Sequence, residues 1–237
     1  MLILSVGMPR AGSGWHYNLV HDLNVAGGGK DARQVRQQYR LGGLLTEVNC
    51  NLGTLGAHRL LPVWLASLAA GRFAIKLHAG PRPLARMLIR VGQVRATYIY
   101  RDPRAALLSA YEYGQRGGSV FKQLKSIKQA IEFTLPYLRI WEAWTEMESV
   151  LAVRYEDMLA DFGEESRRLL EFLNIETSPG VQAILDKYRP GKSSSADKGL
   201  HFHKGQPERF RDALSPEQLA AANQALGDHL ERMGYRL

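Results

Sequence analysis

The chain opens with the stretch Leu2–Trp15, which reads LILSVGMPRAGSGW. Its apolar run, Leu2–Val6, gives way to proline and glycines and then to helix-compatible residues, which predicts a strand, a tight loop and a helix N-terminus. This arrangement suits a phosphate, because backbone N–H groups converge on the anion and the helix dipole favours negative charge. The stretch therefore predicts a phosphate-binding loop after the first strand.

The loop departs from the ATP-binding P-loop at one position. The spacing of Gly7, Gly12 and Ser13 is nearly that of a P-loop, but the lysine that would follow Gly12 and reach the β- and γ-phosphates of ATP is missing. A cation stands inside the loop instead, at Arg10. We therefore expect a phosphorylated nucleotide other than ATP. A small-molecule kinase with a divergent P-loop and a non-catalytic nucleotide-binding module are the alternatives.

The charge of the chain is concentrated in one stretch. The formal net charge is +8, and residues 72–104 hold eight Arg or Lys against one acid, Asp102. Such a concentration suits a polyanionic ligand, because the guanidinium fork matches phosphate geometry. The alternative for Arg82, Arg86 and Arg90 is a solvated helix face. Nucleic acid is not an expected partner, because no helix-turn-helix, zinc-finger or RNA-recognition signature is present.

Cysteine usage and hydropathy bear on the compartment. Cys50 is the single cysteine, so no disulfide forms within the chain and a reducing compartment is the default. The apolar stretch Leu60–Gly71 is too short to span a bilayer and contains Pro62. No basic region precedes the first apolar run, as it would in a signal peptide. We therefore expect a cytoplasmic protein without a transmembrane segment.

Predicted strands and helices alternate along the chain. Apolar, β-branched or aromatic runs predict strands at Leu2–Val6, Phe73–Leu77, Arg95–Tyr100 and Val150–Val153. Helical patterns lie at Trp15–Ala26, Arg59–Ala70, Arg82–Val91, Arg104–Gln115, Phe121–Glu148, Glu164–Leu173, Pro179–Tyr188 and Pro216–Met233. This alternation predicts an α/β fold with a central parallel sheet between two helical layers, and ligands at the carboxyl ends of the strands.

We expect a single domain over residues 1–237, with no internal repeat or linker. Residues 26–56 are glycine-rich and weakly periodic, which predicts a loop or cap over the site. Residues 189–211 form a long polar and basic stretch, and long loops in compact domains are usually functional or disordered.

Residues suited to a nucleotide follow every predicted strand. The loop of residues 9–15 follows the first, and Lys76-x-His78 ends the second. The third is followed by residues 101–111, which read RDPRAALLSAY, and the fourth ends beside Tyr155. A late loop holds His203-Lys204-Gly205. In this order, the set resembles the sulfotransferase family that uses 3′-phosphoadenosine 5′-phosphosulfate (PAPS), whose fold is related to that of P-loop NTPases.

The resemblance implies a nucleotide site. The loop Arg10, Ala11, Gly12, Ser13, Gly14 and Trp15 matches the 5′-phosphosulfate loop, in which the aromatic residue stacks on adenine. Arg101 and Ser109 match the pair that binds the 3′-phosphate, and Tyr155 matches a residue at the adenine ring. His203, Lys204 and Gly205 match the closing loop, with His203 in place of a usual arginine. Residues 189–211 would then cover the nucleotide.

The resemblance also implies the chemistry. His78 matches the general base on the acceptor hydroxyl, a role that imidazole suits because its ordinary pKa lies near the operating pH. Lys76 and Arg10 would neutralise sulfuryl charge without Mg²⁺, so no metal is expected. The acceptor would be a small molecule, lipid or carbohydrate, and residues 26–56 and 112–148 would line its site. The product nucleotide would be 3′,5′-ADP. The resemblance gives neither the acceptor's identity nor the oligomeric state.

Overall fold

The computed structural model describes residues 1–191 and 207–237, and its centre is the strand that the opening stretch predicts. Strand β1 (Leu2–Gly7) is buried along its whole length. It lies between β2 (Phe73–Leu77) and β3 (Val94–Tyr100), and β4 (Val150–Arg154) pairs with the outer side of β3. All pairings are parallel, with Ser5 in register with both Lys76 and Thr97. A buried parallel strand explains why the run Leu2–Val6 is apolar except at Ser5.

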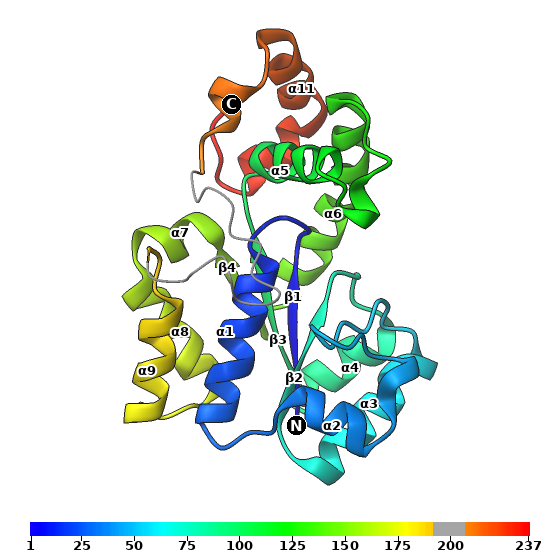
Figure 1. Ribbon diagram of the computed structural model, residues 1–237, viewed down its shortest axis with the longest axis vertical. Coiled ribbons are helices and arrows are strands. Elements are labelled where there is room, and N and C mark those ends of the chain that lie inside the picture. Colours follow the sequence, from blue (N-terminus) through cyan, green and yellow to red (C-terminus); the bar gives the residue numbers. More distant parts are fainter. Residues whose placement is uncertain (192–206) are drawn as a thin grey trace.

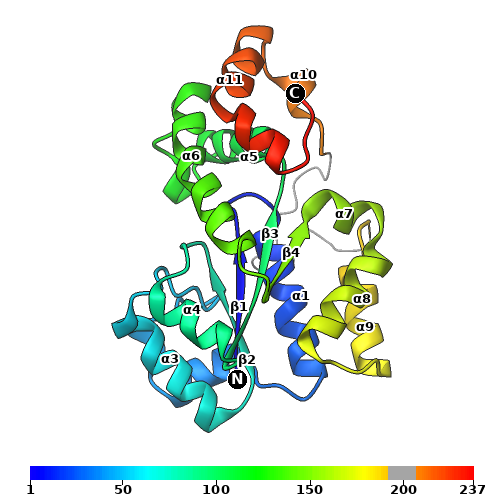
Figure 2. The same ribbon diagram turned by 180° about the vertical axis from the view of Figure 1, so that it is seen from behind.

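Helices cover both faces of this sheet (Figures 1 and 2). One face packs against α1 (Ser13–Ala26), α7 (Tyr155–Ala160), α8 (Phe162–Leu173) and α9 (Pro179–Tyr188). The other face packs against α2 (Ala32–Gln38), α3 (Ala57–Ala70), α4 (Pro83–Arg90) and α6 (Ile127–Thr145). The predicted α/β fold with a central parallel sheet is confirmed.

The carboxyl ends of the strands are bordered by a further group of helices (Figure 1). These are α5 (Pro103–Gln115), α10 (Phe210–Ala213) and α11 (Pro216–Arg232), and α5 and α11 both pack against α6. Two short 3₁₀ turns lie at Leu41–Gly43 and Ser119–Phe121. Among the described helices, none combines the length and apolarity needed to cross a bilayer.

The structure differs from the sequence-based element assignments at three places. Residues 26–56 are not only loop, because Asp31 accepts hydrogen bonds from the backbone of the first turn of α2 and starts a helix of seven residues. Helix α6 begins at Ile127 and not at Phe121, since Ser126 caps it. The short helix α7, directly after β4, was missed.

Candidate functional site

The predicted phosphate loop leaves β1 at Gly7 and enters α1 at Ser13, one residue after the predicted strand end and two residues before the predicted helix start. Gly7 has no room for a side chain, because a Cβ there would lie 2.6 Å from Cγ2 of Ile99. Gly12 has a φ of +79° and lies against Tyr155, whose Cδ2 would be 2.7 Å from an added Cβ. Gly12 is also the N-cap of α1 and supplies no capping side chain, so the loop and the helix N-terminus suit an external anion.

Arg10 is held in the left-handed backbone region, with a φ of 66°. Such a conformation is uncommon and costly for a residue with a side chain, and residues held in it cluster at functional sites. Its Nε donates a hydrogen bond to Oγ of Ser109 on α5 at 3.2 Å. Its guanidinium carbon lies 4.4 Å from the ring centroid of Tyr113. Burial, together with the nearby charge of Arg101, lowers the pKa of Arg10.

Lys76 and His78 lie at the end of β2, beside the phosphate loop. Lys76 is buried, and burial together with the charge of Arg10 lowers its pKa to about 8. His78 Nδ1 lies 2.6 Å from the carbonyl oxygen of Gly7. Burial, together with the charge of Lys76, lowers the pKa of His78 to about 4, below the near-neutral value expected from sequence. These positions place an uncharged imidazole and two cations around one strand end.

Arg101, Tyr155 and Trp15 form a connected group on the other side of the loop. The guanidinium carbon of Arg101 lies 4.7 Å from the ring centroid of Tyr155. The Tyr155 ring meets Trp15 edge to face, with centroids 6.1 Å apart. Trp15 is buried, stacks on Phe162 and donates its Nε1 hydrogen to the carbonyl of Tyr188. Its contacts here are with protein, and its contact with adenine stays a prediction.

Sequence reasoning gave no role to Arg104, although the Arg-Asp-Pro-Arg motif contains it. Its guanidinium is 1% exposed and binds both carboxylate oxygens of Asp102, the N-cap of α5. It also donates to Oδ1 of Asn223 and to the carbonyl of Arg236. Arg104 therefore ties the motif to the C-terminal helix. The signal was available, because a second arginine two residues after a capping aspartate suits a bidentate pair.

The remaining predicted site residues divide into two groups. Ala11, Ser13 and Gly14 lie in the phosphate loop or the first turn of α1. His203, Lys204 and Gly205, and most of residues 189–211, lie outside the described residues.

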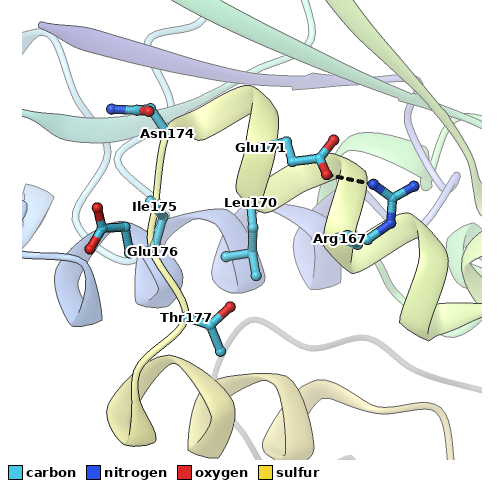
Figure 3. Close-up of a pocket in the computed structure, with 7 residues that line it drawn as sticks. All are labelled: Arg167, Leu170, Glu171, Asn174, Ile175, Glu176 and Thr177. Carbon is cyan, nitrogen blue, oxygen red and sulfur yellow. Dashed lines mark hydrogen bonds and ion pairs between the residues drawn. The ribbon is translucent and has the colours of Figure 1, made fainter.

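A separate hollow is found at the other end of the sheet (Figure 3). It is lined by Arg167, Leu170, Glu171, Asn174, Ile175, Glu176 and Thr177. Arg72, directly before β2, donates to the carbonyl of Leu173, which places the hollow near the amino ends of the strands. None of its lining residues belongs to the predicted site.

Residues 2–234 match the family described as the sulfotransferase domain. The chain therefore belongs to this family, and the sequence-based assignment is confirmed.

Known proteins of this family resemble the chain at low identity. A 3-alpha-hydroxysteroid sulfotransferase of Cavia porcellus is 26% identical over 106 residues, which are 40% of this chain and 37% of that protein. A mouse sulfotransferase solved with PAP has a TM-score of 0.64 and 17% identity, covering 97% of this chain and 84% of that one. A retinol dehydratase solved with androsterone and the inactive cofactor PAP has a TM-score of 0.62 and 20% identity. The match covers 100% of this chain and 82% of that one. These structures share the fold.

Proposed function

We propose that this protein transfers the sulfuryl group of PAPS to a hydroxyl group, with 3′,5′-ADP as the product nucleotide. The observation that carries the proposal is the meeting of His78, Lys76 and Arg10 at one end of the sheet, beside a loop suited to phosphate. The structures of similar fold that were solved with PAP, which is 3′,5′-ADP, support the choice of nucleotide. A cytoplasmic location is part of the proposal, because the single cysteine allows no disulfide within the chain.

The proton is taken by His78. A carbonyl oxygen only accepts hydrogen bonds, so the contact with Gly7 requires the hydrogen on Nδ1 and leaves Nε2 with a free lone pair. Nε2 then accepts the proton of the acceptor hydroxyl as its oxygen attacks sulfur. The bond between sulfur and the 5′-phosphate oxygen breaks, and the leaving phosphate keeps the electron pair. Lys76 and Arg10 stabilise the charge that develops on the transferring group and the leaving oxygen.

The nucleotide is held by the phosphate loop, Arg101 and Ser109. The hydroxyl of Ser109 is already oriented by Arg10, so the two proposed phosphate subsites are connected through one side chain. A guanidinium suits this position, because it donates several hydrogen bonds in one plane and stays charged. We include Lys204 and Gly205 in this site because of their match to the family motif.

The acceptor lies between residues 26–56 and residues 112–148 in this proposal. The first segment touches the site through Leu52, whose N–H donates to the carbonyl of Lys76 at 3.1 Å. The second contributes Tyr113 and Phe121, whose ring centroids lie 4.4 and 5.9 Å from the guanidinium carbon of Arg10. Aromatic rings at this point suit an acceptor with an apolar part.

Thermal unfolding with added nucleotides tests the nucleotide site. 3′,5′-ADP should stabilise the protein far more than 5′-AMP, because each charge-assisted hydrogen bond to the 3′-phosphate contributes about 1.5–3 kcal/mol. Arg101→Ala should remove most of this difference. Arg139→Ala, an exposed arginine on α6, is the matched control and should leave it unchanged. Equal stabilisation of the unaltered protein by the two nucleotides would exclude the 3′-phosphate site.

A chelator separates this proposal from the kinase alternative. Sulfuryl transfer from PAPS to a phenol should continue in EDTA, because the chain supplies its own cations through Lys76 and Arg10. Dependence on Mg²⁺, together with stabilisation by ATP–Mg²⁺ in place of 3′,5′-ADP, would favour a kinase. Binding of 3′,5′-ADP without transfer to any of a panel of hydroxyl acceptors would favour a non-catalytic module.

A further inference from the structure

Exposed apolar side chains are concentrated on α3 and α4. Of the nine large hydrophobic side chains exposed among the described residues, five belong to these helices and the residue after α4. Leu61, Leu65 and Leu68 are 41, 49 and 52% exposed on α3, and Met87 and Val91 are 52 and 59% exposed. The spacing of the leucines, four and then three residues apart, places them on one helix face. Monomeric proteins rarely leave such a group uncovered.

The leucine face of α3 lacks charged side chains. Arg59 is the one Lys, Arg, Asp or Glu in this helix, and its side chain is bound to backbone. Its Nη2 donates to the carbonyl of Leu44 at 2.8 Å and its Nε to that of Leu52 at 3.1 Å. The row of leucines is therefore not interrupted by a polar partner that would keep it in water.

The exposed face of α4 and its N-cap adds positive charge to this surface. Arg82, Arg86 and Arg90 follow one another at intervals of four residues, and all three are exposed. Among the described residues none of them has an acid within ion-pair distance, and Arg86 donates only to the carbonyl of Ala143. By contrast, the exposed Arg167 pairs with glutamates.

The two helices are neighbours in the fold. Both pack on the same face of the sheet, and both views of the ribbon show α3 and α4 next to each other (Figures 1 and 2). On α4 itself the exposed Met87 lies between the exposed Arg86 and Arg90 in the sequence. Two neighbouring helices therefore carry an exposed apolar row and an exposed row of cations that have no acidic partner among the described residues.

We propose that this α3–α4 face docks on the surface of a membrane that contains anionic lipids. The leucines and Met87 enter the boundary between headgroups and acyl chains, and Arg82, Arg86 and Arg90 bind headgroup phosphates. The charge complementarity selects a lipid surface, since interfacial helices combine apolar side chains with Arg or Lys on the flanks. The docking requires no turnover, so it stands independently of the proposed reaction.

Vesicle sedimentation with the whole chain tests this docking. The protein should sediment with vesicles of equal parts phosphatidylcholine and phosphatidylglycerol, should stay in solution with phosphatidylcholine alone, and should be released by high salt. The double variant Arg86→Gln/Arg90→Gln should bind about 25-fold more weakly, from about fivefold for each arginine near the surface. Leu65→Gln/Leu68→Gln should bind at least about tenfold more weakly.

Two control variants make the assay specific. Arg236→Gln, next to the C-terminus, and Val25→Gln, near the end of α1, remove an exposed arginine and an exposed valine outside α3 and α4, and both should bind as the unaltered protein does. Thermal unfolding of each variant checks that the fold is kept. Failure to bind the mixed vesicles, or equal binding by all variants, overturns the proposal. A dimer in solution that Leu65→Gln dissociates, without vesicle binding, would assign the face to a second copy of the chain and also overturn it.

Discussion

The imidazole of His78 is oriented by the carbonyl oxygen of Gly7, the last residue of β1, at a distance of 2.6 Å from Nδ1. The contact joins the end of one strand to the loop of its neighbour, because β1 and β2 run parallel and in register. It selects the tautomer with the hydrogen on Nδ1 and therefore presents a basic Nε2. The same backbone that starts the phosphate loop thus positions the proposed base.

Substitution of His78 should show that turnover needs its basicity and not only its hydrogen bond to Gly7. His78→Asn retains an N–H that can donate to Gly7 but has no base, and His78→Ala has neither. Both should reduce turnover about 10²–10⁴-fold, the range for loss of a general base. Affinity for 3′,5′-ADP should stay the same, because the proposed partner of His78 is the acceptor. Steady-state rates with a poorly acidic alcohol and calorimetry with 3′,5′-ADP measure the two effects.

The pH profile gives an independent readout of His78. Since burial and the charge of Lys76 lower its pKa to about 4, the imidazole is neutral above that pH and activity should fall only as pH drops towards 4. This acidic limb should be missing from the residual activity of His78→Asn. His58→Asn, an exposed histidine on α3, is the control and should keep both rate and profile. Near-normal turnover by His78→Asn would rule out the base.

Lys76 should produce a decrease of activity at alkaline pH. Burial and the charge of Arg10 lower its pKa to about 8, so the free enzyme loses this cation as pH rises through about 8. The kcat/KM for PAPS, which reports the free enzyme, should therefore decrease above that pH. Lys76→Gln should be slower at all pH values and lack the decrease. An unchanged limb in Lys76→Gln would assign it to another group.

Arg104 should be a residue of stability and not of nucleotide contact. Arg104→Ala leaves Asp102 buried without its bidentate partner, and breaking a buried pair in this way costs about 3–5 kcal/mol. Urea unfolding measures the free energy of unfolding, with Arg139→Ala as an exposed control. A loss no larger than that of the control would show that the bonds to Asp102, Asn223 and Arg236 contribute little.

The sequence predicted the sheet well because three of its four strands are buried along most of their length. Largely apolar runs such as Phe73–Leu77 match the observed strands to within a residue at either end. Short helices within irregular stretches were missed, because α2 and α7 span few residues and lack a long repeat. Their starts depend on local caps such as Asp31, which a search for periodicity does not detect.

Motifs identified the candidate site, but not the contacts within it. The spacing of Lys76 and His78 marked a strand end, whereas the bond from His78 to Gly7 joins residues 71 positions apart and depends on the sheet. The bond from Arg10 to Ser109 likewise needs α5 to return over the phosphate loop. The lowered pKa of His78 could not be predicted from the sequence either, because it follows from burial and from the charge of Lys76 in the folded protein.

Acid stability should depend on His16, a histidine buried behind the phosphate loop. His16 lies on α1, shares a hydrogen bond of 3.0 Å with Oγ1 of Thr97, and is fully buried. Burial lowers its pKa from the ordinary 6.5 to about 4. Between these values the unfolded chain binds a proton that the folded protein does not, so the stability that is complete above pH 6.5 decreases as pH falls.

The size of this effect follows from the shift. A pKa lowered by this amount is equivalent to about 3 kcal/mol when pH reaches the folded value, and His78 adds a similar dependence of its own. His16→Gln carries an amide that can still meet Thr97 but does not titrate, so its free energy of unfolding should change less between pH 6.5 and 4. Urea unfolding at several pH values gives the slope, which is compared between variants so that a uniform loss of stability does not matter. His58→Gln should keep the original slope, and an equal slope in His16→Gln would show that His16 is protonated in the folded protein.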